Sequence, residues 1–181
     1  MKNSKILKVV IGTSIIVLPF FINSCKSVKV PTGLSVFENF DVKSYSGKWY
    51  EIARFDFKHE KDMDQVTAEY SINDDGSIKV LNKGFDTKKN EWKESEGKAK
   101  FVGSPNQGAL KVSFFGPFYA GYNIVAMEPN YKNALIFGEN KDYIWLLSRE
   151  KKMTESVKEK FLKIARDYGY DLDRLVWTKH E

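Results

Sequence analysis

The sequence is poor in the residues that build cross-links, metal sites and nucleophilic centres. Its 181 residues include one cysteine, Cys25, and two histidines, His59 and His180. A lone cysteine excludes an internal disulfide, and no His/Cys cluster is present to hold a transition metal. No serine lies in a G-x-S-x-G turn, the signature of a large class of hydrolases. We therefore predict that the protein is not an enzyme and that it uses no metal and no cofactor.

Long hydrophobic runs are also absent, apart from one near the N-terminus. The apolar run from Val9 to Ile22 follows three lysines and leads to Ser24-Cys25. A basic segment, a short apolar segment and a small residue, in that order, predict a secretory signal over residues 1–24. The run is interrupted and falls short of the roughly 20 apolar residues that a spanning helix needs. An uncleaved N-terminal anchor helix is the alternative.

The position of Cys25, directly after the apolar run, resembles the lipobox of bacterial lipoproteins. We predict that cleavage before Cys25 leaves this cysteine as a lipid-modified N-terminus. Acyl chains contribute about 0.8 kcal/mol per buried CH₂ and would hold the protein on a membrane. Lys26 follows, and the absence of aspartate at that place favours the outer membrane. Residues 25–35 are then a lipidated tether, and residues 36–181 form the folded domain.

The charge pattern gives no sign of a nucleic-acid partner. Removal of residues 1–24 takes away three lysines and no acidic residue, so the net charge falls from +5 to +2. In the remainder, lysines and glutamates are interspersed and form no basic patch of the kind that phosphate backbones require.

The chain after the tether reads as short strands separated by turn signals. Alternating and apolar runs predict strands over 48–56, 66–72, 77–85, 92–102, 108–115, 121–127, 134–138 and 143–149. Short links join each strand to the next, which favours an antiparallel barrel. Thr154 and Gly169 bound one amphipathic helix, and a short strand follows over 175–178. The predicted fold is all-β: an eight-stranded up-and-down antiparallel barrel with one C-terminal α-helix packed outside.

Strand parity separates the side chains that face the interior from those that face water. In the strand 92–102 the charged residues share one parity, which assigns Ser95, Gly97, Ala99 and Phe101 to the interior. Small side chains beside aromatic ones leave space between them. The pattern therefore predicts a hollow barrel.

The same parity argument yields a candidate ligand-binding set. Ser113 is expected to face water, whereas Asn82 is expected to offer one hydrogen bond inside the cavity. The complete set comprises Tyr70, Asn82, Ala99, Phe101, Val112, Phe114, Tyr122, Ile124, Tyr143 and Trp145. Aromatic and aliphatic side chains of this kind suit an apolar ligand.

Two ends of the predicted sheet carry residues that can close a barrel. Gly47-x-Trp49 opens the first strand and Arg149 ends the eighth, so closure would bring the guanidinium onto the indole face. Such a stack is worth about 1–2 kcal/mol when it is desolvated. Glu51 shares the parity of Trp49 and would also face inward, with Arg149 as the nearest expected partner.

The opposite, open end of the barrel would receive the segment 114–122, the most aromatic stretch of the chain. It is interpreted either as ordinary closure of a loop or as an apolar lip that guides an acyl chain. Arg54, Lys58, His59 and Lys61 lie near the same end and could meet a phosphate or carboxylate. Each of these four is alternatively a solvated surface residue.

These motifs resemble the lipocalins, and within them the bacterial outer-membrane group, with apolipoprotein D as a more distant member. The matching runs include NFDVKSYSGKWYEIARFD, YSINDDGSIKVLNKGF, LKVSFFGPFYAGYNIVAM and DYIWLLSR. The resemblance implies an eight-stranded calyx that binds fatty acids or lysophospholipids at the membrane, with a homodimer involved in ligand capture. The competing hypothesis is a structural envelope lipoprotein whose barrel is filled by its own side chains.

Overall fold

The computed structural model describes residues 27–58 and 60–181. The predicted signal segment, Cys25 and His59 lie outside the described residues. The strands that it defines are β1 (Gly47–Phe55), β2 (Met63–Ile72), β3 (Ile78–Asp86), β4 (Glu91–Phe101), β5 (Ala109–Phe115), β6 (Phe118–Met127), β7 (Asn133–Gly138), β8 (Ile144–Ser148) and β9 (Leu175–Trp177). The helices are α1 (Val42–Tyr45) and α2 (Glu155–Asp167), and two short 3₁₀ segments cover Pro129–Tyr131 and Leu172–Arg174.

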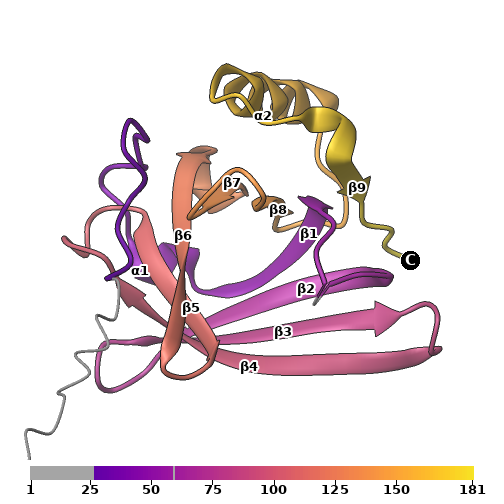
Figure 1. The fold of residues 1–181 in the computed structure, drawn as a ribbon, viewed down its shortest axis with the longest axis horizontal. Helices are drawn as coiled ribbons and strands as arrows, with labels where there is room; N and C mark the ends of the chain where they lie inside the picture. Colours follow the sequence, from indigo (N-terminus) through magenta and orange to yellow (C-terminus); the bar gives the residue numbers. More distant parts are fainter. Residues whose placement is uncertain (1–26, 59) are drawn as a thin grey trace, which may run out of the picture.

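Strands β1 to β8 form the closed up-and-down barrel that the sequence predicts (Figure 1). Each strand pairs antiparallel with the next, and the additional pairing of β1 with β2 closes the ring. The predicted strand ends are close to those observed. The largest differences are at β2, which begins at Met63, and at β6, which begins at Phe118.

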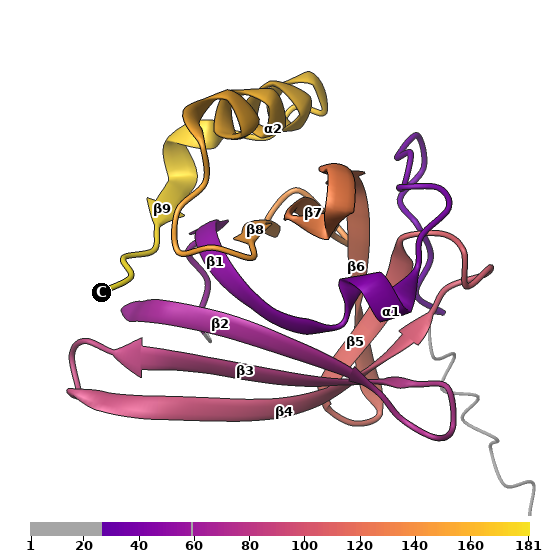
Figure 2. The same cartoon turned by 180° about the vertical axis from the view of Figure 1, so that it is seen from behind.

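Turn chemistry sets the register of the strands. At the β2–β3 turn the sequence Asn73-Asp74-Asp75-Gly76 closes a hairpin, and Gly76 adopts the left-handed φ of +74° that favours glycine. The Asp75 carboxylate accepts a hydrogen bond from the Ser77 backbone N–H at 2.9 Å. A second turn over 87–90 connects β3 to β4, and the two strands form a long hairpin (Figures 1 and 2).

Helix α2 covers the outside of the barrel beside β7 and β8 (Figure 1). Thr154 stands at its N-cap position as predicted, although its side chain makes no capping hydrogen bond to the backbone. Phe161 and Ala165 are fully buried against Leu135, Phe137 and other apolar residues of the wall. The predicted stripe of the helix therefore packs on the barrel. None of the described helices is long and apolar enough to cross a membrane.

The two ends of the barrel differ. At one end lie α1, the 73–76 turn, the loop 102–108 and Arg149. At the other end lie the loop 56–62 and the turns 87–90, 116–117 and 139–143. We refer to these as the closed end and the open end. A second apolar cluster, which includes Trp49, Tyr70, Ile78, Val80 and Ile124, fills the barrel between them.

Candidate ligand-binding site

The structure brings together the three residues predicted to close the barrel. The guanidinium carbon of Arg149 lies 3.9 Å from the ring centre of Trp49. The Arg149 guanidinium also donates hydrogen bonds of 2.8–3.0 Å to the backbone carbonyls of Ser44, Tyr45, Ser46 and Lys48. Gly47 has a φ of +91°, so a side chain there would be strained. Together these contacts form a polar seal beneath the apolar interior.

Three tyrosine hydroxyl groups meet just above this seal. The Tyr122 hydroxyl lies 2.6 Å from that of Tyr45 and 2.9 Å from that of Tyr70. Burial raises the pKa of Tyr70 to about 12 and raises the pKa of both Tyr45 and Tyr122 well above the usual value. All three therefore stay neutral at physiological pH. The floor of the barrel interior is a small hydrogen-bonded patch within apolar surroundings.

Most of the predicted ligand-binding residues line the barrel interior. Asn82 pairs across strands with Ala68, which packs in the interior cluster, and its Oδ1 is buried without a hydrogen-bond partner in the described residues. Tyr143 lies at the open end and stacks on Trp145 with 6.1 Å between ring centres. The remaining eight belong to the interior cluster: Tyr70, Ala99, Phe101, Val112, Phe114, Tyr122, Ile124 and Trp145.

One expectation about the wall at β4 and β5 is wrong. Ser95 is exposed rather than interior, because β4 pairs with β5 only from Lys98 to Phe101 and runs on beyond the barrel wall. Ser113 pairs with the exposed Lys98 and so points outward as expected, but it is only 8% exposed. The space beside Gly97 is also not empty, since a Cβ there would lie 2.8 Å from the ring of Phe114. At this point an aromatic ring fills the room that the glycine leaves.

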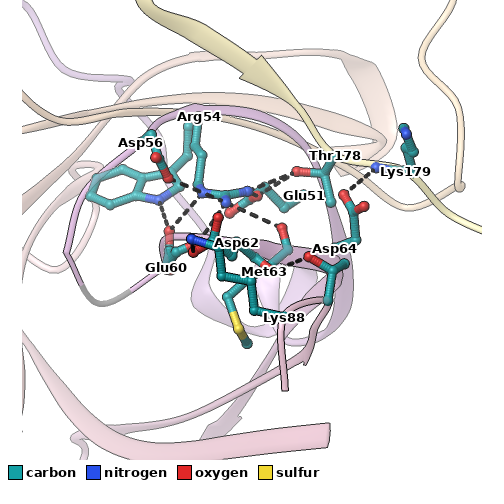
Figure 3. A network of polar contacts seen from close by, with 12 residues as sticks. Glu51, Arg54, Asp56, Glu60, Asp62, Met63, Asp64, Lys88, Thr178 and Lys179 are labelled. Atoms are coloured by element: carbon teal, nitrogen blue, oxygen red, sulfur yellow. Dashed lines mark hydrogen bonds and ion pairs between the residues drawn. The ribbon is translucent and has the colours of Figure 1, made fainter. Parts of the chain in front are cut away.

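A buried ionic network occupies the open end (Figure 3). Glu51 does not pair with Arg149, as the sequence suggested, but with Arg54, whose Nη1 lies 2.7 Å from the Glu51 carboxylate. The Thr178 hydroxyl donates to the same carboxylate oxygen at 2.6 Å. Arg54 is 1% exposed, so it is not a rim cation that awaits a ligand head group.

A β-bulge explains why Arg54 turns inward. The register between β1 and β8 shifts between Glu51 and Ala53, and after the shift Arg54 pairs directly with Trp145. Side chains on directly paired residues share one face of a sheet, and a one-residue shift moves a side chain to the other face. Because Trp145 packs in the interior cluster, the bulge directs Arg54 to the interior as well.

Arg54 also ties the loop 56–62 to the open end. Its Nη2 donates to the backbone carbonyls of Glu60 at 2.6 Å and Met63 at 3.2 Å. The indole N–H of Trp145 donates to the Glu60 carboxylate at 3.2 Å. Burial, followed by repulsion from Glu51, raises the pKa of Glu60 to about 8. The loop is therefore held over the open end by a carboxyl group that resists ionisation.

The other cations predicted for the open end are solvated. Lys58 and Lys61 are exposed side chains of the loop, and no ion pair is found for either among the described residues. Phe115 and Phe118 of the β5–β6 turn are 72% and 79% exposed, which fits the interpretation of this segment as an apolar lip. No group of three or more His, Cys, Asp or Glu side chains in the described chain is arranged to hold a metal ion.

Sequence reasoning missed Glu60, Phe57 and Tyr45 as neighbours of the interior. Phe57 packs edge-on against Trp145, with 5.9 Å between ring centres. Tyr45 belongs to the short helix α1, which no strand pattern predicts, and it is fully buried beside Trp49. The available signal was that Phe57 and Tyr45 are aromatic residues in otherwise polar connecting segments. Large apolar rings are usually buried, so their presence in a connecting segment indicates contact with the core.

A closed antiparallel barrel with an aromatic interior, a sealed floor and an open end defines the class of calyx-shaped binding proteins. A family model described as a lipocalin-like domain matches residues 40–180, and the chain belongs to this family. Membership supports a function in binding small hydrophobic ligands.

The chain is similar to several named members of the family. It is 48% identical over 160 residues to outer membrane lipoprotein Blc of Citrobacter freundii, which covers 88% of this chain and 90% of that protein. Apolipoprotein D of Mus musculus is 30% identical over 169 residues, or 88% of this chain and 84% of that protein. The structure of insecticyanin from the tobacco hornworm, 18% identical, matches with a TM-score of 0.65 over 83% of this chain and 86% of that chain, and it bears on the fold alone.

Proposed function

We propose that this protein binds and carries single-chain amphipathic lipids, such as fatty acids and lysophospholipids, at the bacterial outer membrane. The acyl tail enters the barrel between Tyr70, Phe114, Tyr122 and Trp145, and the polar head stays at the open end. One observation carries the proposal: eight of the ten predicted ligand-binding residues pack together in one apolar cluster inside the barrel. The family membership and the names of the bacterial relatives support it.

The expected affinity follows from burial. A sixteen-carbon chain gains about 13 kcal/mol at roughly 0.8 kcal/mol per CH₂, and ordering of the chain and the protein offsets much of this. Micromolar binding or somewhat tighter is the expected result. Such binding selects for length and shape more than for chemical identity.

The location is proposed from the sequence and from the relatives. Relatives named outer membrane lipoprotein support the same location for this chain, with lipidated Cys25 as the anchor. Mass spectrometry of the mature N-terminus tests the anchor, since lipidation adds the mass of the acyl chains to Cys25. A homodimer in ligand capture is tested by sedimentation of the soluble chain from residue 26 onward, with and without a lysophospholipid.

Tryptophan fluorescence tests the binding site. Titration with a palmitoyl lysophospholipid should quench the emission and saturate at about one ligand per barrel. Trp145→Ala should weaken the binding, because Trp145 lies among the interior residues. Trp92→Phe is the matched control, since Trp92 is 50% exposed on β4. The absence of saturable binding in the unaltered protein would reject the proposal.

A structural lipoprotein without a ligand is the competing function. The Phe114 ring that fills the space beside Gly97 favours it, because interior volume is taken up by the protein itself. Native mass spectrometry of protein purified without detergent separates the two functions. Co-purified lipid supports the carrier, and protein that remains free of lipid even after exposure to lysophospholipid supports the structural role.

A further inference from the structure

The barrel wall splits between β4 and β5. These strands pair over four positions, from Lys98 with Ser113 to Phe101 with Leu110. From Glu91 to Gly97, β4 has β3 on one side, and no strand of the described chain pairs with its other side. Figures 1 and 2 show the same arrangement, in which the β5–β6 hairpin crosses one end of β4 and the rest of β4 runs on beside β3.

A pocket of about 530 Å³ lies on the outer side of this split. Pockets that hold small molecules typically have volumes of about 300–1,000 Å³. The residues that line it come from both strands and from the neighbouring turns: Lys79, Glu96, Lys98, Ser113, Phe114 and Tyr119. The Ser113 hydroxyl is buried in this wall and has no hydrogen-bond partner among the described residues. A buried hydroxyl without a partner is destabilising, so a ligand acceptor would stabilise it.

Phe114 separates the outer pocket from the barrel interior. Its side chain lines the pocket and also packs against the interior cluster. It seats there because position 97 is glycine: a Cβ at Gly97 would lie 2.8 Å from two ring carbons of Phe114. The register of β5 with β6 shifts between Val112 and Phe115, so the ring is carried on an irregular segment of backbone. Phe114 is therefore the side chain that stands between the outer pocket and the interior cluster.

The charges around the pocket favour an anionic ligand. Lys79 and Lys98 line it, and Lys111 lies 5.2 Å above the ring of Tyr119. Two carboxylates oppose these three lysines, Glu96 on Lys79 at 2.8 Å and Asp75 on Lys98 at 3.2 Å. At the open end the buried Arg54 is already paired with the carboxyl groups of Glu51, Asp56 and Glu60. The outer pocket therefore offers an anionic head group lysines that the buried arginine of the open end does not replace.

We propose that the split between β4 and β5 is a side entrance for single-chain anionic amphiphiles, with Phe114 as its gate. The head group occupies the outer pocket, near Ser113 and the lysines, while the acyl chain passes Phe114 into the barrel. This inference rests on the proposed function, because it requires that the interior accepts an acyl chain. It adds a second route to the one through the open end.

Stopped-flow fluorescence with cis-parinaric acid tests the entrance. Phe114→Ala should accelerate both uptake and release on the order of tenfold, with a smaller change in Kd, because a gate affects both directions. Gly97→Ala, which displaces the ring, should act in the same direction. Val176→Ala is the control, since Val176 is a partly exposed apolar residue, 37% exposed, on β9 and not on β4, β5 or β6. Circular dichroism melting verifies that each variant is folded.

A charge variant tests the outer pocket. Lys79→Gln with Lys98→Gln should slow uptake of cis-parinaric acid and leave uptake of its uncharged methyl ester unchanged. Equal rates for Phe114→Ala and Val176→Ala would overturn the entrance, and so would weaker binding with an unchanged uptake rate, which would place Phe114 in the wall. If the unaltered protein binds neither probe, the proposed function fails together with the entrance.

Discussion

Replacement of Arg149 by alanine should remove a large part of the stability of the barrel. Arg149 donates to the backbone carbonyls of Ser44, Tyr45, Ser46 and Lys48, and its Nε donates to the carbonyl of Tyr131 at 3.2 Å. These carbonyls belong to the segment from α1 to the start of β1 and to the turn that precedes β7. The side chain therefore links two segments that lie far apart in the sequence.

The magnitude follows from which groups lose their partners. The carbonyls of Ser44 and Lys48 are exposed and regain water, whereas those of Tyr45, Ser46 and Tyr131 are partly buried. The Tyr45 carbonyl keeps a hydrogen bond from the Trp49 indole N–H at 2.8 Å, so two partly buried acceptors are left without a donor. They cost about 1 kcal/mol each, and the lost stack on the indole ring adds about 1–2 kcal/mol. The expected loss is about 3–4 kcal/mol, a substantial share of the roughly 5–15 kcal/mol that is typical of a domain.

Urea unfolding followed by circular dichroism measures this loss, and the midpoint should fall at an unchanged m-value. Arg149→Lys should recover less than half, because one ammonium group cannot reach carbonyls on both segments. Arg174→Ala is the control: its guanidinium lies 4.6 Å from the ring centre of Phe55, but its side chain is 45% exposed. A loss for Arg149→Ala no greater than that for Arg174→Ala would refute the reasoning.

Three further changes test the core, the floor and the open end. The free energy of unfolding should fall as the pH rises from 4.5 to about 8, because folded Glu60 keeps a proton that the unfolded chain releases. Urea unfolding at several pH values measures this dependence, and the free energy of unfolding should depend less on pH in Glu60→Gln. Tyr122→Phe removes the hydroxyl shared by Tyr45 and Tyr70 and should cost about 1–3 kcal/mol in thermal melting. Phe161→Ala, beneath α2, should cost about 3–5 kcal/mol by the same measurement, whereas a substitution at an exposed position of the helix should not.

Local patterns predicted the barrel because its strands are short, amphipathic and joined in sequence order. Each strand can be recognised from its own alternation, and an up-and-down ring needs no information about distant pairings. The closure residues were found for a related reason, since Gly47-x-Trp49 and Arg149 stand at the two ends of the ring. Where alternation is regular, as from Lys98 to Phe101, the predicted faces agree with the structure.

The open end could not be predicted because its contacts depend on interruptions of that alternation. The bulge after Glu51 moves the side chain of Arg54 from the outer face of β1 to the inner face. The residue types around it do not predict the bulge. Glu60 lies in a loop, where strand alternation does not assign side chains to a face. Its carboxylate accepts a hydrogen bond from Trp145, which is 85 residues away in the sequence. Ser95 was assigned to the interior because the alternation of β4 continues beyond Lys98, where the pairing with β5 and the barrel wall end.

Unequal strand lengths give the two sides of the barrel different properties. On one side β7 and β8 have six and five residues, and their outer faces are covered by α2, which anchors Phe161 and Ala165 in a dry interface. On the other side β4 has eleven residues, and β5 follows it for only four pairings. Figure 1 places α2 and β4 on opposite sides of the barrel, so the helix supports the complete wall and leaves the divided one uncovered. Movement of ligand through the wall is therefore expected at β4 and β5, because from Glu91 to Gly97 no strand of the described chain pairs with that side of β4.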